Sequence, residues 1–235
     1  MGSSRFPGKP MYKINEIPMI EHVYKNVTKN NKFETFVATC DNEIYNHIES
    51  INGNAVYTSI SHERASDRCA EALLEIEKKE KKKFDIVVMV QGDEPMVNEE
   101  MIEESSSPLI IDKNIFVSNL YSEIKTKEEL EDRNCIKVVH DNNFNALYFS
   151  RQPIPYQKSL LSSLPKKQVC VISFQRDFLL KYIDLLETPL EKSESVDMMR
   201  VLEHGYKVKL IKTNHQSFAV DTKDDIKKVE KFLIN

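Results

Sequence analysis

A short run of polar residues follows the most apolar segment of the chain, FDIVVMV at residues 84–90. That segment is typical of a strand buried on both faces. The run after it begins Gln91-Gly92-Asp93, and ligands of open α/β sheets bind outside the carboxyl ends of the strands. A carboxylate there can hold Mg²⁺ through oxygen and leave coordination positions for phosphate and water. Alternatively, Asp93 caps a helix or closes a turn, and the motif alone does not decide between the two.

The N-terminal segment GSSRFPGKP, residues 2–10, has the composition of a phosphate-binding loop. Its glycine and serine backbone N–H groups, including that of Ser4, can surround a phosphate. Arg5 and Lys9 add positive charge suited to a triphosphate. The spacing differs from that of a Walker P-loop. Taken alone, the segment is read more simply as a basic tail or the remnant of an expression tag.

A third acidic position precedes the last amphipathic segment, AVDTKDDIKKVEKFL at residues 219–233. A short strand is expected to end at Asp221, which could supply a second metal ligand. Equally, Asp221 or Thr222 could cap the helix that follows. Caps are common at this position, so the cap is the favoured interpretation of this segment by itself.

Helix and strand patterns alternate along the chain, which favours an α/β fold with a mostly parallel sheet covered by helices. The expected helices span 18–27, 42–51, 66–80, 177–186, 195–203 and 222–234. The expected strands span 35–39, 84–90, 115–120, 136–140, 146–150, 168–174 and 207–212. Two segments, 104–108 and 152–165, have the composition of loops.

The bulk properties fit one soluble domain over residues 1–235. The net charge of −4 gives no sign of a nucleic-acid partner. No apolar run approaches the ~18 residues of a membrane span, and no secretory signal is recognisable at the N-terminus. The four cysteines are scattered singly, without metal-ligand spacing. We therefore expect a cytoplasmic protein without a membrane partner.

The order and content of these motifs resemble those of the 3-deoxy-manno-octulosonate (Kdo) cytidylyltransferase family, the CMP-Kdo synthetases, within the sugar-nucleotidyltransferase superfamily. The resemblance runs along nearly the whole chain. It is carried by GSSRFPGKP (2–10), VATCD (37–41), HERASDRCAEA (62–72), VQGDEP (90–95), KVVHD (137–141), ALYFSR (146–151), PLEKSESVDMMRVLEHG (189–205) and VDT (220–222).

The resemblance implies a Rossmann-like nucleotide-diphospho-sugar transferase fold and a function for each matched residue. On the nucleotide side, CTP would be bound by Ser4, Arg5, Lys9, Asp67, Arg68 and Gln91. On the sugar side, the acceptor would be bound by Arg151, Gln168, Glu194 and Asp197. The catalytic group would comprise Lys9, Asp93 and Asp221, with both carboxylates on Mg²⁺.

The implied reaction transfers CMP from CTP to the anomeric hydroxyl of Kdo and releases pyrophosphate, for lipopolysaccharide or capsule biosynthesis. A carboxylate-bearing nucleophile must then approach a highly negative triphosphate, which explains the need for Mg²⁺ and for the cations Lys9 and Arg5. The resemblance also implies a homodimer, with a small dimerisation lobe at approximately 134–175.

The chain departs from the family pattern at three places. The family opens with a buried strand ahead of the glycine-serine motif, and from the position of Met1 we expect that first β-strand to be missing from the chain as given. Ala65 and Ser66 replace a Gly-Thr pair, and Ala adopts positive φ less readily. Gln168 stands where a sugar-contacting His is expected, and Met198 where a polar residue is expected, so acceptor recognition can differ.

These departures keep other functions open. The acceptor could be another 2-keto sugar acid, such as 8-amino-Kdo or a sialic, legionaminic or pseudaminic acid. A nucleotidyltransferase for a phosphorylated acceptor would need a basic cluster, which we do not find within 168–200. A catalytically weak homologue that serves as a binding partner is a further alternative, supported by the missing strand and opposed by Lys9, Asp93 and Asp221.

Overall fold

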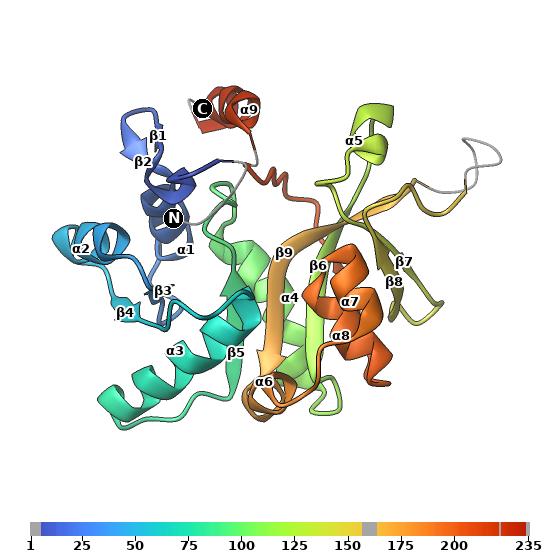
Figure 1. The fold of residues 1–235 in the computed structure, drawn as a ribbon, viewed down its shortest axis with the longest axis horizontal. Coiled ribbons are helices and arrows are strands. Elements are labelled where there is room, and N and C mark those ends of the chain that lie inside the picture. The colour runs from blue at the N-terminus through green and yellow to red at the C-terminus, as the bar shows by residue number, and fades with distance from the viewer. Residues whose placement is uncertain (1–5, 157–163, 221, 234–235) are drawn as a thin grey trace. The chain divides into compact units, whose positions relative to one another are not determined.

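The computed structural model describes residues 6–156, 164–220 and 222–233. It divides into two compact units (Figure 1). The first unit comprises Met1–Phe84, Val90–Ile102 and Gln216–Asn235, and the second comprises Asp85–Met89 and Glu103–His215. None of the helices in these described ranges is both long enough and apolar enough to cross a membrane.

The first unit is built from short strands and amphipathic helices. Its elements are η1 (Lys9–Met11), β1 (Lys13–Ile14), β2 (Ile17–Pro18), α1 (Met19–Val27), β3 (Val37–Thr39), α2 (Asn42–Ser50), β4 (Ala55–Tyr57), α3 (Ala65–Glu80) and α9 (Lys223–Leu233). Strand β1 pairs antiparallel with β2, whereas β3 runs parallel to β4. Helix α2 begins where its sequence indicates, because the Asp41 side chain accepts a hydrogen bond from the Glu43 amide at 3.0 Å.

The second unit contains the large sheet. Its strands are β5 (Ile86–Val90), β6 (Val117–Glu123), β7 (Lys137–His140), β8 (Ala146–Ser150), β9 (Lys166–Gln175) and β10 (Lys209–Lys212). The order is β10-β6-β9-β7-β8, and β5 pairs with β9. Strand β6 runs parallel to β10 but antiparallel to β9, and β7 is antiparallel to both of its neighbours. The α/β class with a helix-flanked sheet is confirmed, but this sheet is mixed where we expected a mostly parallel one.

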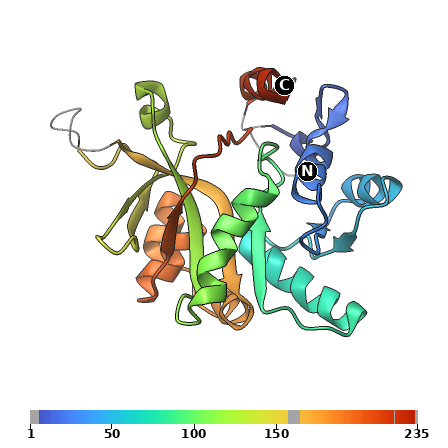
Figure 2. The same ribbon diagram turned by 180° about the vertical axis from the view of Figure 1, so that it is seen from behind.

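Helices flank both faces of this sheet, as the two opposite views show (Figures 1 and 2). Helices α7 (Pro189–Glu194) and α8 (Asp197–Glu203) lie on one face, and α4 (Glu99–Ile111) lies on the other. The remaining helices are α5 (Lys127–Glu131) and α6 (Arg176–Ile183). The sheet core contains fully buried side chains from several strands, among them Leu120, Phe149, Val171 and Phe174, and burial is continuous along most of β6 because helices cover both faces.

The loop expected at 104–108 is wrong, because these residues lie inside α4. The serine-rich stretch remains helical because its hydroxyl groups find partners. Ser107 donates to the Glu103 carbonyl at 2.6 Å, and the hydroxyls of Ser105 and Ser173 lie 2.7 Å apart. The helix also continues past Pro108, whose carbonyl accepts from the Asp112 amide at 2.9 Å. Tertiary packing thus overrides the local loop composition.

Candidate functional site

Lys9 and Asp93 lie together in the first unit. The Lys9 Nζ atom is 2.5 Å from Asp93 Oδ2, and the two side chains are only 10% and 20% exposed. Gly8 precedes η1 with φ of 73°, a backbone conformation that suits glycine and turns the chain into this short helix. Phe6 anchors the segment by packing in a buried cluster with Ile14 and other apolar residues.

The segment that follows β5 is fixed by backbone and side-chain hydrogen bonds. The Val220 amide donates to the Asp93 carbonyl at 2.9 Å. Buried Glu94 accepts from the Ser217 hydroxyl, and Asn26 donates to the Pro95 carbonyl at 2.7 Å. A Cβ atom added at Gly92 would lie 3.0 Å from Ile20 Cδ1, so a larger residue there would press on α1. The structure therefore holds the Asp93 backbone rigidly.

Asp93 has the free oxygen that a metal ion needs. Its Oδ1 atom is buried and has no hydrogen-bond partner among the described residues. A buried carboxylate oxygen without a donor is costly unless a cation or water meets it. The residues present therefore fit Mg²⁺, which prefers oxygen ligands. Within the described ranges, no group of three or more acidic, His or Cys side chains gathers as a metal cluster.

Three of the expected site residues, Ser4, Arg5 and Asp221, lie outside the described residues. The helix that follows Asp221 is capped by Thr222. The Thr222 hydroxyl accepts from the Asp225 amide at 3.4 Å, and the Thr222 amide donates to Asp225 Oδ2 at 2.9 Å. The sequence offers Asp221 and Thr222 as candidate caps, and these capping contacts are made by Thr222.

Arg68 shapes the loop that precedes α3. Its guanidinium donates to Thr58 Oγ1 at 2.5 Å and to the carbonyls of Ser59 and His62 at 3.2 and 3.3 Å. Glu71 completes the loop by accepting from the Ser59 amide at 2.8 Å and by contacting His62. The Ser59 amide, with His62 and Arg68, holds the pKa of Glu71 below its ordinary value.

The remaining nucleotide-side residues also fall in the first unit. Asp67 lies in the first turn of α3, and Gln91 follows β5 and accepts the Glu94 amide at its carbonyl. Ala65 is the first residue of α3 and does not have a positive φ. Replacement of the family's glycine by Ala65 therefore introduces no backbone strain at this position.

Arg151 and Glu194 form the corresponding cluster in the second unit. The Arg151 guanidinium donates to the carbonyls of Glu194, Arg133 and Ser195 at 2.6, 3.0 and 3.2 Å. The Glu194 carboxylate accepts from the Arg151 amide at 2.8 Å and from the Tyr148 hydroxyl at 3.2 Å. Burial and Glu194 raise the pKa of Tyr148, so its hydroxyl remains a donor at neutral pH. Arg151 therefore joins the end of β8 to the turn between α7 and α8.

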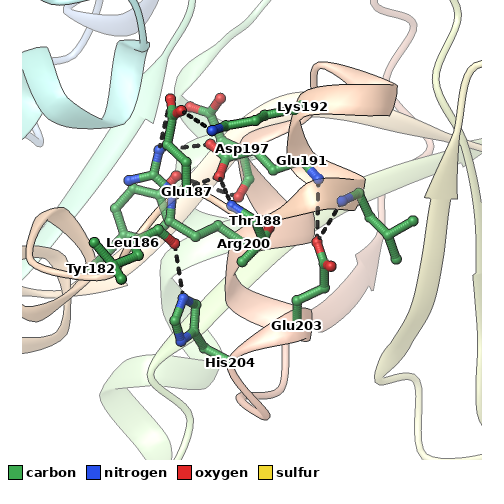
Figure 3. A network of polar contacts seen from close by, with 11 residues as sticks. Tyr182, Leu186, Glu187, Thr188, Glu191, Lys192, Asp197, Arg200, Glu203 and His204 are labelled. Carbon is green, nitrogen blue, oxygen red and sulfur yellow. Dashed lines mark hydrogen bonds and ion pairs between the residues drawn. The ribbon is translucent and has the colours of Figure 1, made fainter.

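A buried ion pair supports that turn (Figure 3). Arg200 donates to both carboxylate oxygens of Glu191 at 2.7 Å, and the two side chains are 4% and 0% exposed. The Arg200 guanidinium also stacks over the Tyr182 ring, 4.6 Å from its centroid. Asp197 begins α8, and its carbonyl accepts from the Tyr182 hydroxyl at 3.4 Å. Helix α7, which ends at Glu194, is thereby tied to α8 across the turn.

Two buried polar residues of the second unit were missed in the sequence. Lys137 is fully buried, and its ammonium donates to the carbonyls of Asp132, Cys135 and Arg151 at 2.8, 2.7 and 2.7 Å. Burial lowers the pKa of Lys137. Asn119 is also fully buried, and its Oδ1 atom accepts from Gln168 Nε2 at 2.6 Å. The sequence signal that could have identified them is a polar residue, Lys or Asn, within an otherwise apolar strand, because a buried polar group needs hydrogen-bond partners.

Comparisons with known proteins agree with this arrangement of motifs. Residues 1–212 match the family model described as cytidylyltransferase. A 3-deoxy-manno-octulosonate cytidylyltransferase of Fusobacterium nucleatum is 36% identical, over 98% of this chain and 92% of the relative. One of Syntrophus aciditrophicus is 38% identical, over 99% and 93%.

A solved structure of a CMP:2-keto-3-deoxy-manno-octonic acid synthetase complexed with CTP superposes with a TM-score of 0.86 at 32% identity. The match covers 99% of this chain and 94% of that one. These findings confirm the resemblance that the motifs indicate. The chain belongs to the cytidylyltransferase family and, within it, to the 3-deoxy-manno-octulosonate cytidylyltransferases.

Proposed function

We propose that this chain transfers CMP from CTP to the anomeric hydroxyl of Kdo and releases pyrophosphate. The observation that carries the proposal is the buried Lys9–Asp93 pair, formed by two family motifs that are 84 residues apart in sequence. The names of relatives at 36% and 38% identity support Kdo as the acceptor. The CTP complex of a related synthetase supports CTP as the donor.

On the nucleotide side, Lys9 stabilises negative charge on the phosphates, together with Arg5 and Ser4 of the same segment. Asp93 and Asp221 would hold Mg²⁺, which supplies charge neutralisation at the triphosphate and alignment for attack on the α-phosphorus. Asp93 offers Oδ1 to the cation, since this atom has no donor among the described residues. The backbone bond from Val220 to Asp93 supports this pairing, because Asp221 follows Val220 directly.

Base and ribose recognition falls to the loop before α3 and to Gln91. Arg68 donates at least three hydrogen bonds to carbonyl and hydroxyl oxygens of residues 58–62, so its role is to shape the loop. Backbone groups of that ordered loop can then read the cytosine edge. Asp67, one residue earlier in the first turn of α3, is the side chain we assign to the nucleoside.

On the acceptor side, Arg151 supplies positive charge for the carboxylate of the sugar acid. Glu194, Asp197 and Gln168 supply hydrogen-bonding groups for its hydroxyls. Pairing of two chains through the lobe at approximately 134–175 is supported by the exposed apolar side chains Phe144 and Leu147, 45% and 61% exposed on the β7–β8 hairpin. We place the enzyme in the cytoplasm, where it would serve lipopolysaccharide or capsule biosynthesis.

A second acceptor class is favoured by two side chains. Met198 is fully buried and offers no hydrogen bond donor, and Gln168 replaces an expected His. An alternative 2-keto sugar acid, such as 8-amino-Kdo or a nonulosonic acid, should therefore be tested as the acceptor.

The test is pyrophosphate release by this chain with CTP, Mg²⁺ and Kdo, with Asp93→Ala as a control. We expect release that requires both Kdo and Mg²⁺ and is lost in the variant. The same assay with 8-amino-Kdo and a nonulosonic acid identifies the preferred acceptor from the ratio of kcat/KM values. Folded wild-type protein that releases no pyrophosphate with any of the three acids would refute the proposed function.

A further inference from the structure

Gln168 is held by a buried partner in the central sheet. Its Nε2 atom donates to Asn119 Oδ1 at 2.6 Å, between strands β9 and β6. Asn119 has no exposed surface, whereas Gln168 is only partly buried. The partly exposed Gln168 amide is therefore held by the buried Asn119 amide inside the sheet.

The orientation of the Asn119 amide is set by its backbone surroundings. Its Nδ2 atom lies 2.8 Å from the Val169 carbonyl, 3.0 Å from the Leu120 carbonyl and 3.3 Å from the Val171 carbonyl. These carbonyls lie where the register between β6 and β9 shifts. Carbonyl oxygens only accept hydrogen bonds, so Nδ2 must face them and Oδ1 must face Gln168.

The orientation of Gln168 follows from that of Asn119. An amide that meets an acceptor must present its NH₂ group to it, so Gln168 points Nε2 inward. Its carbonyl oxygen, Oε1, is the other end of the same amide. Within the described residues, no group donates a hydrogen bond to this oxygen. A neutral acceptor is thus available on the outer end of the side chain.

Gln168 lies at the same end of the sheet as Arg151. The Gln168 amide donates to the Ile136 carbonyl at 2.8 Å, and the next residue, Lys137, pairs with Ser150 in the β7–β8 register. The Lys137 ammonium then donates to the Arg151 carbonyl at 2.7 Å. This is the end at which the parallel strands β6 and β10 finish, the usual place for ligands of α/β sheets.

We propose that Asn119 is a positioning residue for acceptor recognition, because it orients the Gln168 amide so that Oε1 faces the sugar acid. Gln168 then selects an acceptor that donates a hydrogen bond at this position, a hydroxyl or an amino group, over one that only accepts. This inference rests on the proposed function for the identity of the acceptor. The orientation of the amide itself does not depend on it.

The test replaces the amide by a group with the same shape and a titratable proton. In Gln168→Glu, a protonated carboxyl can donate to Asn119 Oδ1 and still present a carbonyl oxygen outward. An ionised carboxylate would place two acceptors against each other, which raises the pKa of the introduced group above the ordinary value of about 4.3 for Glu. The folded variant thus binds the proton more tightly than the unfolded chain does.

The sign of the pH effect follows from this raised pKa. The stability of Gln168→Glu relative to wild type is expected to fall as pH rises from about 4.3 through the raised pKa of the folded state. Over the same window, the KM for the acceptor, divided by that of wild type, should rise about tenfold, because the ionised carboxylate loses its contact with Asn119 Oδ1 and its charge repels the anionic sugar acid. The KM for CTP should not change. Urea unfolding and pyrophosphate release, each measured from pH 5 to 8.5, give both profiles.

Gln175→Glu is the matched control. Gln175 closes the opposite end of β9 and also donates from Nε2 to carbonyl oxygens, 2.9 Å from that of Leu109. Its variant should lose stability with rising pH in the same way but leave the KM for the acceptor unchanged. The double variant Gln168→Glu/Asn119→Thr tests the role of Asn119, because a hydroxyl can donate to the carboxylate. Its pH dependence should be weaker than that of the single variant.

The proposal would be overturned if the free energy of unfolding and the KM for the acceptor depended on pH in the same way in Gln168→Glu and in wild type. Stability that falls with pH while the KM for the acceptor stays constant would also overturn it, since Gln168 would then only support the fold. If the wild-type chain releases no pyrophosphate, the proposed function fails by itself. The unfolding measurements then still confirm or overturn the orientation of Gln168 by Asn119.

Discussion

Lys9 lies 2.5 Å from one carboxylate oxygen of Asp93, while the other oxygen of the same group is buried without a described donor. The pair therefore has one charge satisfied and one acceptor left over. In the proposed function, Lys9 would turn from Asp93 to a phosphate, and a cation would take its place beside the carboxylate. We therefore predict that nucleotide binding and metal binding are coupled through these two residues.

Replacement of the Asp93 carboxylate by an amide tests this coupling. In Asp93→Asn the shape is kept, but the negative charge that pairs with Lys9 and would hold Mg²⁺ is lost. We expect pyrophosphate release to fall roughly a hundredfold or more, the usual cost of losing one preorganised electrostatic group. Steady-state kinetics at several Mg²⁺ concentrations measure this. Asp85→Asn, at an exposed position before β5, is the control and should keep wild-type activity. Comparable rates for both variants would remove Asp93 from the reaction.

Arg151 offers a second test, on the acceptor side. Its planar guanidinium reaches three backbone carbonyls at once, and a lysine ammonium lacks this fork geometry. Arg151→Lys should therefore raise the KM for the sugar acid about tenfold, while the KM for CTP changes little. Initial rates at varied acceptor concentration give the result. Arg176→Lys, at the other end of β9, should leave both constants unchanged. An equal rise in both KM values would argue against a specific role for Arg151.

Local patterns predicted most of the elements that position the site. The apolar period of 42–51 predicts α2, and the apolar run 84–90 contains β5. These signals are carried by residues within one or two turns of each other. The mixed direction of the sheet was not predictable in this way, because it depends on how β9 returns between β6 and β7. The helix over 104–108 likewise depends on a distant partner, Ser173.

The candidate site also contains residues that the sequence identified and residues whose roles depend on distant contacts. The order of the motifs, through the resemblance, was enough to name Lys9 and Asp93, although neither motif was decisive alone. The function of Lys137 could not be read from sequence, because its three carbonyl partners come together only in the folded second unit. The link from Asn119 to Gln168 has the same origin, since it crosses between strands 49 residues apart.

The buried pair of Glu191 and Arg200 predicts a large effect on stability. Removal of one partner leaves a charge in the protein interior, which costs about 3–5 kcal/mol. Glu191→Ala should lower the free energy of unfolding by this amount, measured by urea denaturation. The double variant Glu191→Met/Arg200→Met should recover much of the loss, because buried ion pairs gain little over apolar packing. Glu131→Ala, from an exposed pair with Lys127, should stay within about 0.5 kcal/mol of wild type. A double variant less stable than Glu191→Ala would contradict this account.

Glu71 makes the stability of the loop before α3 depend on pH. Its pKa is held low by the Ser59 amide, with His62 and Arg68, so the folded state favours the carboxylate. The stabilisation is therefore present above the unfolded pKa of about 4.3 and is lost as pH falls through the lower pKa of the folded state. Glu71→Gln should be less stable than wild type at pH 7, and the difference should shrink below about pH 4.3.

Urea unfolding of wild type and Glu71→Gln at a series of pH values measures this difference. Glu75→Gln, on an exposed position of the same helix, is the matched control and should follow wild type throughout. A constant difference between wild type and Glu71→Gln across the acid range would show that the charge of Glu71 is not what stabilises the loop. Because Glu71 orders residues 59–62, the same variant should also bind CTP more weakly at pH 7, whereas the control should bind it as wild type does.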